Sequence, residues 1–372
     1  MKKRILFGIT SLTLGGAERV LVDIANQLCE EYEITIFTIY AKGELEKQLS
    51  PKVTLKSLYD VSFAELSNFQ KRVSVPLKVL LFQNRIYQKQ IKDNYDVEIA
   101  FLEGPITRIF STKNEITKKV VWVHNDISAV FGKGIKAKLK RKIDKKIYEK
   151  YQTIVFVSKD NQEKFEEIYP LKKEKEVIYN YINRETIIQK ANEKMNTIFN
   201  KEEFNIVTVA RLVNQKAIDR LIDVHSKLIQ EGIQHKIYVI GDGPEKSKLQ
   251  KRIEEKEVKD SFILLGQKEN PYPYIKEADC FVLLSYYEGY PMVLLEAQIL
   301  GKYIVITDTA ARETLRNYQN CKIVGNREED IIKGLSEVIQ KKEKYLVKKS
   351  DTQEYQNEEI IKQIKKVIER TD

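Results

Sequence analysis

Ten short aliphatic runs, each about one strand long, alternate with longer segments of helical spacing along this chain of 372 residues. The runs lie at residues 4–9, 34–39, 97–102, 120–124, 154–158, 205–210, 236–240, 262–265, 280–284 and 303–307. Continuous rather than alternating hydrophobicity is typical of parallel strands that helices cover on both faces. The pattern therefore predicts an α/β protein with doubly wound, Rossmann-like sheets.

The length of the chain and one polar segment indicate two domains. A single ordinary core does not grow to 372 residues. The polar residues 184–201 separate the strand-like residues 177–179 from a fresh strand at 205. We expect one domain at residues 1–185 and another at 203–350. Residues 351–372 carry branched apolar side chains at helical spacing, so we expect a C-terminal helix that docks back on the first domain.

The positive charge of the chain is concentrated in its first half. The net charge is +10, and residues 1–180 carry nine of these charges. Residues 131–150 hold nine Lys or Arg against two acidic residues, and Ile135, Leu139, Ile143 and Ile147 recur there every four positions. Such a basic amphipathic helix fits an anionic membrane surface or a phosphate-bearing partner. The alternative is a solvated helix whose apolar stripe packs on the core.

Cysteine usage and hydropathy indicate where the chain works. The three cysteines are far apart and have no paired spacing for disulfides or zinc, which favours the reducing cytoplasm. No stretch approaches the roughly 20 apolar residues of a membrane span. We therefore expect any membrane contact to be peripheral.

Residues 285–300 follow the run at 280–284 and carry two carboxylates, Glu288 and Glu296. Pro291 can start a helix, which places Glu288 in a strand-to-helix loop and Glu296 in the helix. Glu296 has aliphatic neighbours, and burying it there would cost several kcal/mol unless a donor satisfies it, so we expect a partner. The alternative is that Glu288 only complements the helix dipole while Glu296 lies on a wet edge.

Two other loops follow predicted strands, and ligands bind beyond the carboxyl ends of such strands. Gly15 and Gly16 allow the backbone to approach a ligand, although a simple helix start explains them equally well. Arg211 and Lys216 stand five positions apart, and a guanidinium with an ammonium suits a diphosphate. The sequence has no G-x-G-x-x-G, which argues against a dinucleotide dehydrogenase.

The three histidines and the carboxylates form no metal-binding pattern. There is no Asp-x-Asp, and no His, Cys and carboxylate cluster has metal spacing, so we expect neither metal nor cofactor. Fixed cations and a helix N-terminus would then neutralise a leaving diphosphate. His124 ends a predicted strand, where it can donate or accept a hydrogen bond. We expect His225 and His235 on a helix or loop surface.

Several of these motifs, in this order, resemble a known family. Arg211-Leu212 through Lys216, Gly241-Asp242-Gly243-Pro244, Ala278-Asp279 and residues 288–297 are similar to the nucleotide-sugar domain of GT-B glycosyltransferases of family 4. In the first half, residues 15–19 and 122–126 resemble the bacterial capsule and exopolysaccharide branch. One departure is Ala217, because the family usually has Gly after the lysine.

The resemblance implies a GT-B fold, in which two Rossmann-like domains face a cleft, and it implies roles for particular residues. Glu288 and His124 would be catalytic, with Glu288 at the donor sugar and His124 at the acceptor. Arg211 and Lys216 would hold the donor diphosphate, and Glu296 would hold the ribose hydroxyls. The remaining donor-binding residues would be Gly289, Tyr290, Gly15 and Gly16, the last two also lining the acceptor.

The function implied by the resemblance is retaining, metal-independent hexosyl transfer. The donor would be a nucleotide diphosphate sugar, and its nucleotide is usually UDP. The acceptor would be an undecaprenyl-diphosphate-linked oligosaccharide in capsular or exopolysaccharide biosynthesis. The enzyme would lie at the anionic inner face of the plasma membrane. A nucleotide-sugar epimerase on the same fold is an alternative, but it needs acid and base residues gathered around one sugar. A basic nucleic-acid-binding protein is another, although no nucleic-acid-binding motif appears.

Overall fold

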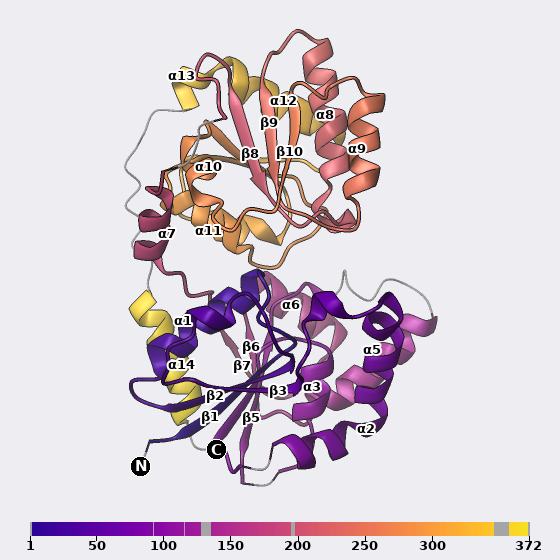
Figure 1. Ribbon diagram of the computed structural model, residues 1–372, viewed down its shortest axis with the longest axis vertical. Coiled ribbons are helices and arrows are strands. Elements are labelled where there is room, and N and C mark those ends of the chain that lie inside the picture. The colour runs from indigo at the N-terminus through magenta and orange to yellow at the C-terminus, as the bar shows by residue number, and fades with distance from the viewer. Residues whose placement is uncertain are drawn as a thin grey trace. The chain divides into compact units, whose positions relative to one another are not determined.

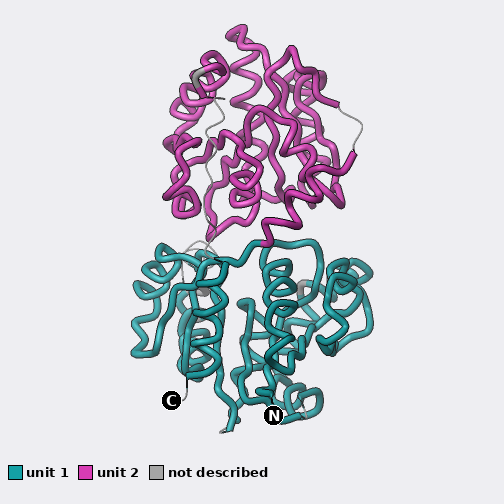
Figure 2. Tube along the Cα trace, turned by 90° about the vertical axis from the view of Figure 1, so that its left-hand side faces the viewer, with its two compact units in different colours: residues 1–182, 356–372 teal, residues 183–355 magenta. Residues whose placement is uncertain are grey.

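The computed structural model describes residues 2–91, 93–114, 116–127, 135–194, 198–345 and 357–370. The chain divides into two compact units, which Figure 2 shows in different colours. Unit 1 comprises Met1–Ile182 with Gln356–Asp372, and unit 2 comprises Asn183–Tyr355. Residues 131–134 of the predicted basic helix lie outside the described residues.

Unit 1 is built on a seven-stranded parallel sheet in the order β3-β2-β1-β4-β5-β6-β7, with helices on its faces (Figure 1). The strands are β1 (Arg4–Ile9), β2 (Glu33–Tyr40), β3 (Thr54–Tyr59), β4 (Val97–Ala100), β5 (Lys118–Val123), β6 (Thr153–Phe156) and β7 (Glu174–Val177). The helices are α1 (Gly16–Leu28), α2 (Val75–Gln90), α3 (Pro105–Phe110), α5 (Ile135–Tyr148), α6 (Lys159–Ile168) and α14 (Asn357–Glu369). Short turns of helix are η1 (Glu46–Gln48), η2 (Phe63–Glu65) and the π-helical η3 (Gln70–Ser74).

Unit 2 is built on a six-stranded parallel sheet in the order β10-β9-β8-β11-β12-β13. The strands are β8 (Asn205–Val209), β9 (Lys236–Ile240), β10 (Phe262–Gly266), β11 (Cys280–Leu283), β12 (Tyr303–Thr307) and β13 (Cys321–Val324). The helices are α7 (Arg184–Ala191), α8 (Ile218–Gln230), α9 (Lys246–Glu255), α10 (Tyr272–Glu277), α11 (Met292–Ile299), α12 (Glu328–Gln340) and α13 (Lys342–Tyr345). The 3-10 turns are η4 (Asn214–Lys216) and η5 (Ala310–Leu315).

The predicted α/β class and doubly wound sheets are confirmed. All ten predicted strands are present, and their ends differ from the prediction by at most two residues. The sequence pattern does not predict β3 and β13, and β7 begins three residues before the strand-like residues 177–179. These three strands lie at sheet edges and are mostly half-exposed, so they lack the continuous aliphatic run of a central strand.

Two segments near the domain boundaries have a definite place. Residues 184–191, which the sequence places outside the second domain, form α7 of unit 2, where Asn270 Nδ2 donates to the Lys190 carbonyl over 2.8 Å. Helix α14 belongs to unit 1. Its Ile364, Val367 and Ile368 are buried, and Glu369 pairs with Lys3 over 2.6 Å.

In each sheet the strand order reverses beside the first strand of the unit. The reversal lies between β1 and β4 in unit 1 and between β8 and β11 in unit 2. In open α/β sheets the loops at such a switch point diverge and leave room for a ligand beyond the carboxyl ends of the strands. The loops that follow these four strands are therefore the places to look for a site.

Candidate active site

The loop from β8 to α8 presents two cations at the switch point of unit 2. Arg211 is exposed at the carboxyl end of β8, and among the described residues no carboxylate forms an ion pair with its guanidinium. Lys216 closes η4, and Ala217 then starts α8 in the left-handed conformation, with φ 50° and ψ 41°. This conformation is uncommon for residues other than Gly, Asn and Asp. The chain therefore keeps a glycine-like turn at the position where the family usually has Gly.

The turn after β9 supports this loop from the side. Gly241 has φ 146°, and a Cβ atom on it would overlap the Ala210 carbonyl oxygen. A Cβ atom on Gly243 would likewise overlap the Leu212 carbonyl oxygen, which accepts a hydrogen bond from Glu245 N over 3.1 Å. These glycines allow two backbones to approach closely, so they position the Arg211 loop rather than contact a ligand themselves.

The loop from β11 to α11 meets the β8–α8 loop directly. Lys216 Nζ lies 2.6 Å from Glu288 Oε1, and Glu288 is only 5% exposed. Gln215 joins the two backbones, because its Nε2 donates to the Tyr287 carbonyl over 3.0 Å and its carbonyl accepts from Tyr286 N over 2.9 Å. The structure thus brings Lys216 and Glu288 together. Glu288 neutralises part of the charge that Lys216 would offer to an anion.

Glu296 is buried in α11 and has the partner that the sequence predicts. It is 8% exposed, and the Tyr272 hydroxyl donates to its Oε1 over 3.1 Å. Helix α11 receives no side-chain cap from Pro291, and the first backbone N–H groups of a helix have no partner within the helix. Gly289 and Tyr290 lie half-buried in the loop that leads to this helix.

Arg220 is a site residue that the sequence does not reveal. It lies on α8, where one of its Nη atoms donates to the Leu284 carbonyl and the other to the Asn326 carbonyl over 3.3 Å. Its guanidinium also stacks 4.6 Å from the centre of the Tyr286 ring. Burial lowers the pKa of Arg220 from its usual value. Arg220 therefore fixes the carboxyl end of β11, and no motif in the sequence marks it.

In unit 1, His124 follows β5 and lies against a carboxylate that the sequence analysis missed. Glu103 Oε1 accepts hydrogen bonds from His124 N over 2.8 Å and from Asn125 N over 2.7 Å. Burial raises the pKa of the Glu103 carboxyl, although these hydrogen bonds oppose the shift. Glu103-Gly104-Pro105 parallels Glu288-Gly289-Tyr290-Pro291, since both carboxylates precede a Gly and the Pro at a helix start. That parallel is the signal that could have identified Glu103.

The His124 ring is neutral, and one of its nitrogens has no partner in the part of the chain that the structure describes. Burial lowers its pKa to about 3, while a hydrogen bond to the Phe101 backbone opposes the shift. Its Nε2 is inaccessible and has no hydrogen-bond partner among the described residues. An imidazole with so low a pKa is a weak base at neutral pH. Its chemistry therefore suits the acceptance of a hydrogen bond better than the removal of a proton.

Gly15 and Gly16 form the start of α1 at the switch point of unit 1. Gly15 is the N-cap residue and offers no side chain, so the first N–H groups of α1 have no cap from that position. A Cβ atom on Gly15 would overlap the Glu18 carboxylate, which lies over the glycine. The end of this flexible side chain can move aside, so the overlap alone does not require a glycine here, and the backbone at Gly15 and Gly16 stays accessible to a ligand.

The structure corrects the prediction for the other two histidines. His225 is fully buried and His235 is 3% exposed, and their Nδ1 and Nε2 atoms lie 2.9 Å apart. His225 Nε2 also lies 2.8 Å from the Ser261 hydroxyl. Helix α8 packs the His225 face onto the sheet, and a polar residue is tolerated there because each ring finds a partner. Burial lowers the pKa of His225 to about 3 and lowers that of His235.

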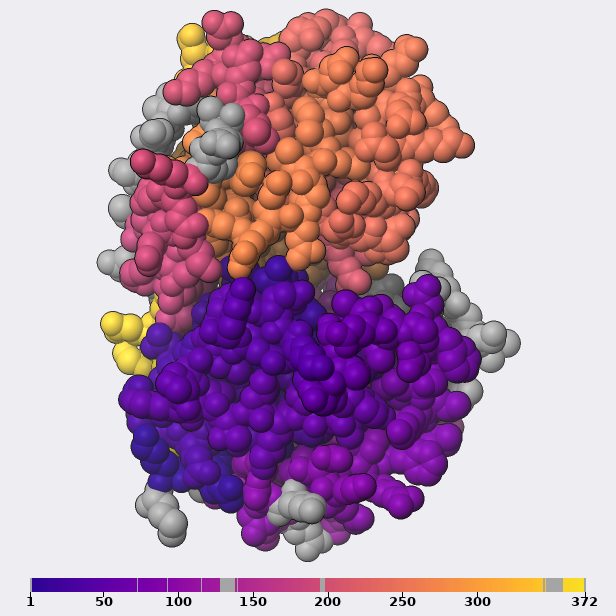
Figure 3. All heavy atoms as spheres, in the orientation of Figure 1, coloured from indigo at the N-terminus to yellow at the C-terminus, as the bar shows by residue number. Residues whose placement is uncertain are grey.

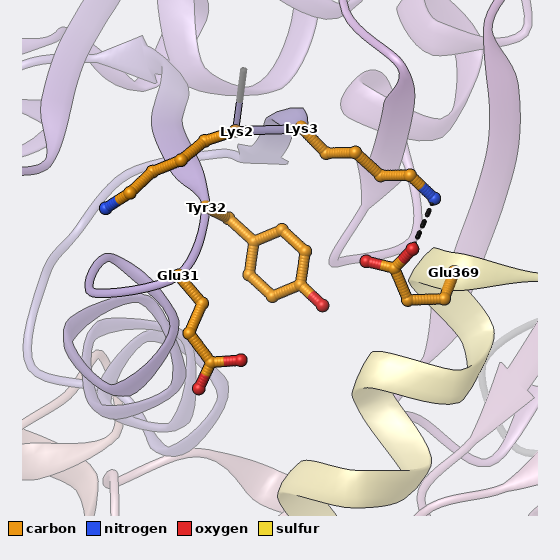
Figure 4. Close-up of a pocket in the computed structure, with 5 residues that line it drawn as sticks. All are labelled: Lys2, Lys3, Glu31, Tyr32 and Glu369. Atoms are coloured by element: carbon orange, nitrogen blue, oxygen red, sulfur yellow. Dashed lines mark ion pairs between the residues drawn. The ribbon is translucent and has the colours of Figure 1, made fainter.

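A surface hollow at the opposite edge of unit 1 has a structural explanation. It is lined by Lys2, Lys3, Glu31, Tyr32 and Glu369, where the end of α14 meets the amino ends of β1 and β2 (Figure 4). Lys3 pairs with Glu369, and the Tyr32 hydroxyl also bonds to Glu369, which together with burial raises the pKa of Tyr32. Ligands of open α/β sheets bind at the carboxyl ends. This hollow is therefore the seam along which α14 docks.

In the described ranges, no three His, Cys, Asp or Glu side chains gather closely enough to hold a metal ion. No helix in those ranges has both the length and the hydropathy needed to cross a membrane.

Comparison with known proteins identifies both halves of the chain. Residues 14–186 match the model of "Glycosyltransferase Family 4", and residues 189–368 match that of "Glycosyl transferases group 1". A diphospho-undecaprenol 4-alpha-N-acetylgalactosaminyltransferase of Campylobacter jejuni is 28% identical over 328 residues, which cover 84% of this chain and 83% of that protein.

Solved glycosyltransferase structures share the fold. Anabaena HepE, solved in complex with UDP and glucose, has a TM-score of 0.75 at 17% identity, with 98% of this chain and 99% of HepE covered. Staphylococcus aureus TarM, solved with UDP, has a TM-score of 0.76 at 12% identity, with both chains fully covered. The two parallel sheets and the two family models agree, and the chain belongs to glycosyltransferase family 4, with the GT-B fold.

Proposed function

We propose that this glycosyltransferase transfers a hexosyl residue, with retention of configuration and without a metal ion, from a UDP-sugar to an undecaprenyl-diphosphate-linked oligosaccharide. The product would belong to a capsular or extracellular polysaccharide. The observation that carries the proposal is the meeting of Lys216 and Glu288, at 2.6 Å, on the loops of the two strands that flank the switch point of unit 2.

The donor diphosphate is assigned to the β8–α8 loop. The Arg211 guanidinium offers a planar fork of donors, and Lys216 keeps two N–H donors beyond the one it gives to Glu288. The N-terminus of α11, which Pro291 does not cap, adds the positive end of the helix dipole and backbone N–H groups. These fixed charges would stabilise the departing UDP where a divalent ion does so in other enzymes.

The donor sugar and nucleoside are assigned to the β11–α11 loop and helix. Glu288, held by Lys216, would accept hydrogen bonds from sugar hydroxyls, with Gly289 and Tyr290 beside it. Glu296 has one oxygen bonded to Tyr272, so its carboxylate is fixed in orientation for the two ribose hydroxyls. Arg220 would act as a positioning residue, since it bonds the carbonyl at the end of β11.

The reaction breaks the bond between the anomeric carbon and the diphosphate and forms a bond from that carbon to an acceptor hydroxyl. In a same-face displacement the leaving phosphate oxygen takes the proton of the hydroxyl, so UDP leaves and no protein base is required. His124 would face the acceptor. Its Nε2 has no partner in the described residues but is inaccessible, so a hydrogen bond from the acceptor to this atom would require the loop after β5 to open. Gly15 and Gly16 would leave the backbone at α1 open to the substrate phosphates and the acceptor.

The relatives support the choice of substrates. The Campylobacter protein is named for transfer to a diphospho-undecaprenol-linked sugar, and HepE and TarM were solved with UDP. An acceptor on an undecaprenyl chain lies in a membrane, and the +10 charge of this chain favours an anionic surface. We therefore place the enzyme at the cytoplasmic face of the plasma membrane as a peripheral protein.

The direct test is a transfer assay with the purified chain, a panel of UDP-hexoses and a synthetic polyprenyl-diphosphate-linked acceptor. Transfer with retained anomeric configuration that continues in excess EDTA is the expected result. Activity lost on chelation and restored by Mg²⁺ or Mn²⁺ would contradict the metal-free mechanism. Reactions without acceptor test the epimerase alternative, because an epimerase would convert the UDP-sugar by itself.

The donor assignment has its own test in Glu296→Ala. Loss of the carboxylate should weaken UDP binding roughly 10- to 100-fold, or about 1.4 to 2.7 kcal/mol, since charged hydrogen bonds are lost. Titration calorimetry measures the affinity for UDP. Uracil, which lacks the ribose, serves as the control ligand. Tyr272→Phe is the matched control, because it removes the partner and keeps the carboxylate. Unchanged UDP affinity in Glu296→Ala would refute the ribose assignment.

A further inference from the structure

The segment from Phe69 to Phe82 concentrates exposed apolar side chains. Of the eleven large apolar side chains that are most exposed among the described residues, six lie within these fourteen positions. They are Phe69 (66% exposed), Val73 (46%), Leu77 (49%), Leu80 (46%), Leu81 (64%) and Phe82 (48%). Single exposed apolar side chains are ordinary, but six within fourteen positions indicate a contact surface. We call these six side chains the apolar face of η3–α2.

Other faces of the same segment hold it firmly to unit 1. Val75, Val79 and Ile86 are buried in the core of unit 1. Tyr87 is buried with them, and its hydroxyl donates to Glu98 Oε1 over 2.6 Å. Glu98 in turn pairs with Lys119 Nζ at 2.6 Å, and all three groups are buried. Helix α2 is therefore anchored to β4 and β5, and its exposed apolar side chains are not those of an undocked core helix.

The charge within the segment that carries the apolar face has one sign. Residues 66–91 contain no Asp or Glu and five cations, at positions 71, 72, 78, 85 and 89. Helix α3 packs against α2 and is joined to the basic helix α5 by Arg108 and Asp144, whose Nη2 and Oδ1 lie 3.0 Å apart. In α5, Ile147 is buried but Ile143 is 43% exposed, so the predicted stripe does not pack wholly on the core.

Helices α2, α3 and α5 lie on the same side of the sheet of unit 1 in Figure 1. Figure 3 shows the violet to purple surface of unit 1, which includes the α2 region, on the side of the molecule that faces the viewer. Apolar side chains bordered by Lys and Arg are the composition of a helix that lies in a membrane interface. An acidic protein partner would match the cations but would leave six apolar side chains without a counterpart. An anionic bilayer satisfies both.

We propose that the apolar face of η3–α2 inserts into the headgroup region of an anionic bilayer, while the cations of α2 and α5 contact lipid phosphates. The inference rests on the proposed function, since it names the surface by which the enzyme would reach a membrane-borne acceptor. It differs from the sequence analysis in assigning insertion to α2 and leaving only electrostatic contact to α5.

The first test is sedimentation with vesicles of phosphatidylglycerol and phosphatidylcholine. The double variant Phe69→Ser/Leu81→Ser should bind at least tenfold more weakly than the natural chain. Ile116→Ser is the matched control, because Ile116 is 73% exposed in the same unit but lies outside the segment, and it should change binding less than twofold. Vesicle binding by the double variant equal to that of the natural chain would overturn the proposal.

A second test reports insertion at the position itself. The chain has a single tryptophan, Trp122, which is buried, so it supplies a constant background. Leu81→Trp should show a blue-shifted emission with the vesicles and be quenched by brominated lipid, whereas Ile116→Trp should not. If Leu81→Trp is unchanged by vesicles, or if the double variant only loses self-association in light scattering, the surface is not a membrane contact.

Activity separates this inference from the proposed function. With the acceptor in vesicles, Phe69→Ser/Leu81→Ser should transfer at least tenfold more slowly, whereas transfer to a water-soluble short-chain acceptor should be unchanged. Equal loss with both acceptors would overturn the membrane role and leave the function standing. If the natural chain uses neither acceptor, the proposed function fails, and the vesicle and tryptophan results still decide the membrane contact.

Discussion

The switch points of the two units occupy the same place in their sheets and carry different chemistry. At β1 and β4 of unit 1 lie Gly15 and Gly16, with Glu103 on the neighbouring loop. At β8 and β11 of unit 2 lie Arg211 and Lys216, with Glu288 on the neighbouring loop. Glu103 binds backbone N–H groups beside His124, whereas Glu288 binds the Lys216 ammonium. A carboxylate at one topological position thus fixes a loop in one unit and a cation in the other.

The scaffolds below these residues are alike. The Leu12 carbonyl accepts from Leu45 N over 2.9 Å, and the Leu212 carbonyl accepts from Glu245 N over 3.1 Å. Gly43 in unit 1 and Gly243 in unit 2 pass so close to these leucine carbonyls that a Cβ atom would overlap them. The first loop of each unit is therefore braced in the same way by the loop after the second strand. The two units therefore differ in the charged side chains of this first loop and not in the way the loop is held.

That difference suggests a division of labour. A diphosphate needs fixed positive charge, and the switch point of unit 2 supplies two cations while residues 10–17 of unit 1 supply none. The neutral backbone and the neutral His124 of unit 1 suit a hydroxyl-bearing acceptor. We expect the following changes to break or sharpen this contrast.

The largest effect is expected when unit 2 is made as neutral as unit 1. Arg211→Ala/Lys216→Ala should lower kcat/KM roughly 1000-fold, or about 4 kcal/mol, because the charge that develops on the leaving diphosphate loses its cations. Steady-state release of UDP measures this. Lys248→Ala/Lys251→Ala on α9, two exposed cations of the same unit, should have no effect. Near-normal transfer by Arg211→Ala/Lys216→Ala would contradict the assignment of the diphosphate to the cations of unit 2.

Acid should destabilise unit 2 through its buried histidine pair. His225 and His235 bind protons in the unfolded chain below about pH 6.5 but not in the folded unit, because burial lowers the pKa of His225 to about 3 and lowers that of His235. Stability is therefore full above pH 6.5 and falls as the pH drops toward 4, by an amount on the order of 2 kcal/mol.

The readout of this prediction separates the units. His225→Gln should flatten the pH dependence of unfolding followed by far-ultraviolet circular dichroism. The emission of Trp122 reports the unfolding of unit 1, where the tryptophan is buried in β5. In His225→Gln, the pH dependence of the unfolding transition of unit 1 should be unchanged. An unchanged slope of stability against pH in His225→Gln would contradict a neutral buried pair.

Removing the carboxylate of unit 1 should slow catalysis and leave donor binding intact. In Glu103→Ala the His124 and Asn125 N–H groups lose their acceptor, so the loop after β5 loosens. We expect kcat to fall about tenfold, roughly 1.4 kcal/mol, with the Kd for UDP unchanged. Glu103→Gln keeps an acceptor oxygen and should recover most of the rate. A change in UDP affinity would place Glu103 in the donor site instead.

The smallest effect is expected at the start of α8. Ala217→Gly relieves a left-handed alanine, worth about 1–2 kcal/mol, but removes a buried methyl group and frees the unfolded chain. These terms nearly cancel, so thermal unfolding should shift by less than about 1 kcal/mol. Ala217→Val is the contrast, because a β-branched residue does not adopt this conformation without strain. Tolerance of Val equal to that of Gly would contradict the left-handed assignment.

Central strands were predictable, whereas the edge strands β3 and β13 were not. Residues 280–284 and 303–307 read as continuous aliphatic runs because helices cover both faces of β11 and β12. In β3 and β13 polar and half-exposed residues interrupt the pattern, so neighbouring strands rather than the local sequence define them. The same reason hid the histidine pair, because a lone His on an amphipathic helix gives no sign that a second ring, ten residues away, will meet it.

For the candidate site, the sequence by itself determined which residue types stand at the carboxyl ends of strands. Arg211, Lys216 and Glu288 were placed in this way, and Glu296 in the helix that follows, since local order along the chain fixes which loop follows which strand. A partner for Glu296 was also predictable, because a buried carboxylate must have one.

Only the tertiary structure decided which of these residues meet. It paired Lys216 with Glu288 across 72 positions and placed Tyr272 beside Glu296. It also added Glu103, whose sequence signal was missed, and Arg220, which no motif marks. It also left six apolar side chains of η3–α2 outside the core. The physical reason is that strand order and helix packing set distances between segments far apart in the chain, and local sequence carries no measure of those distances.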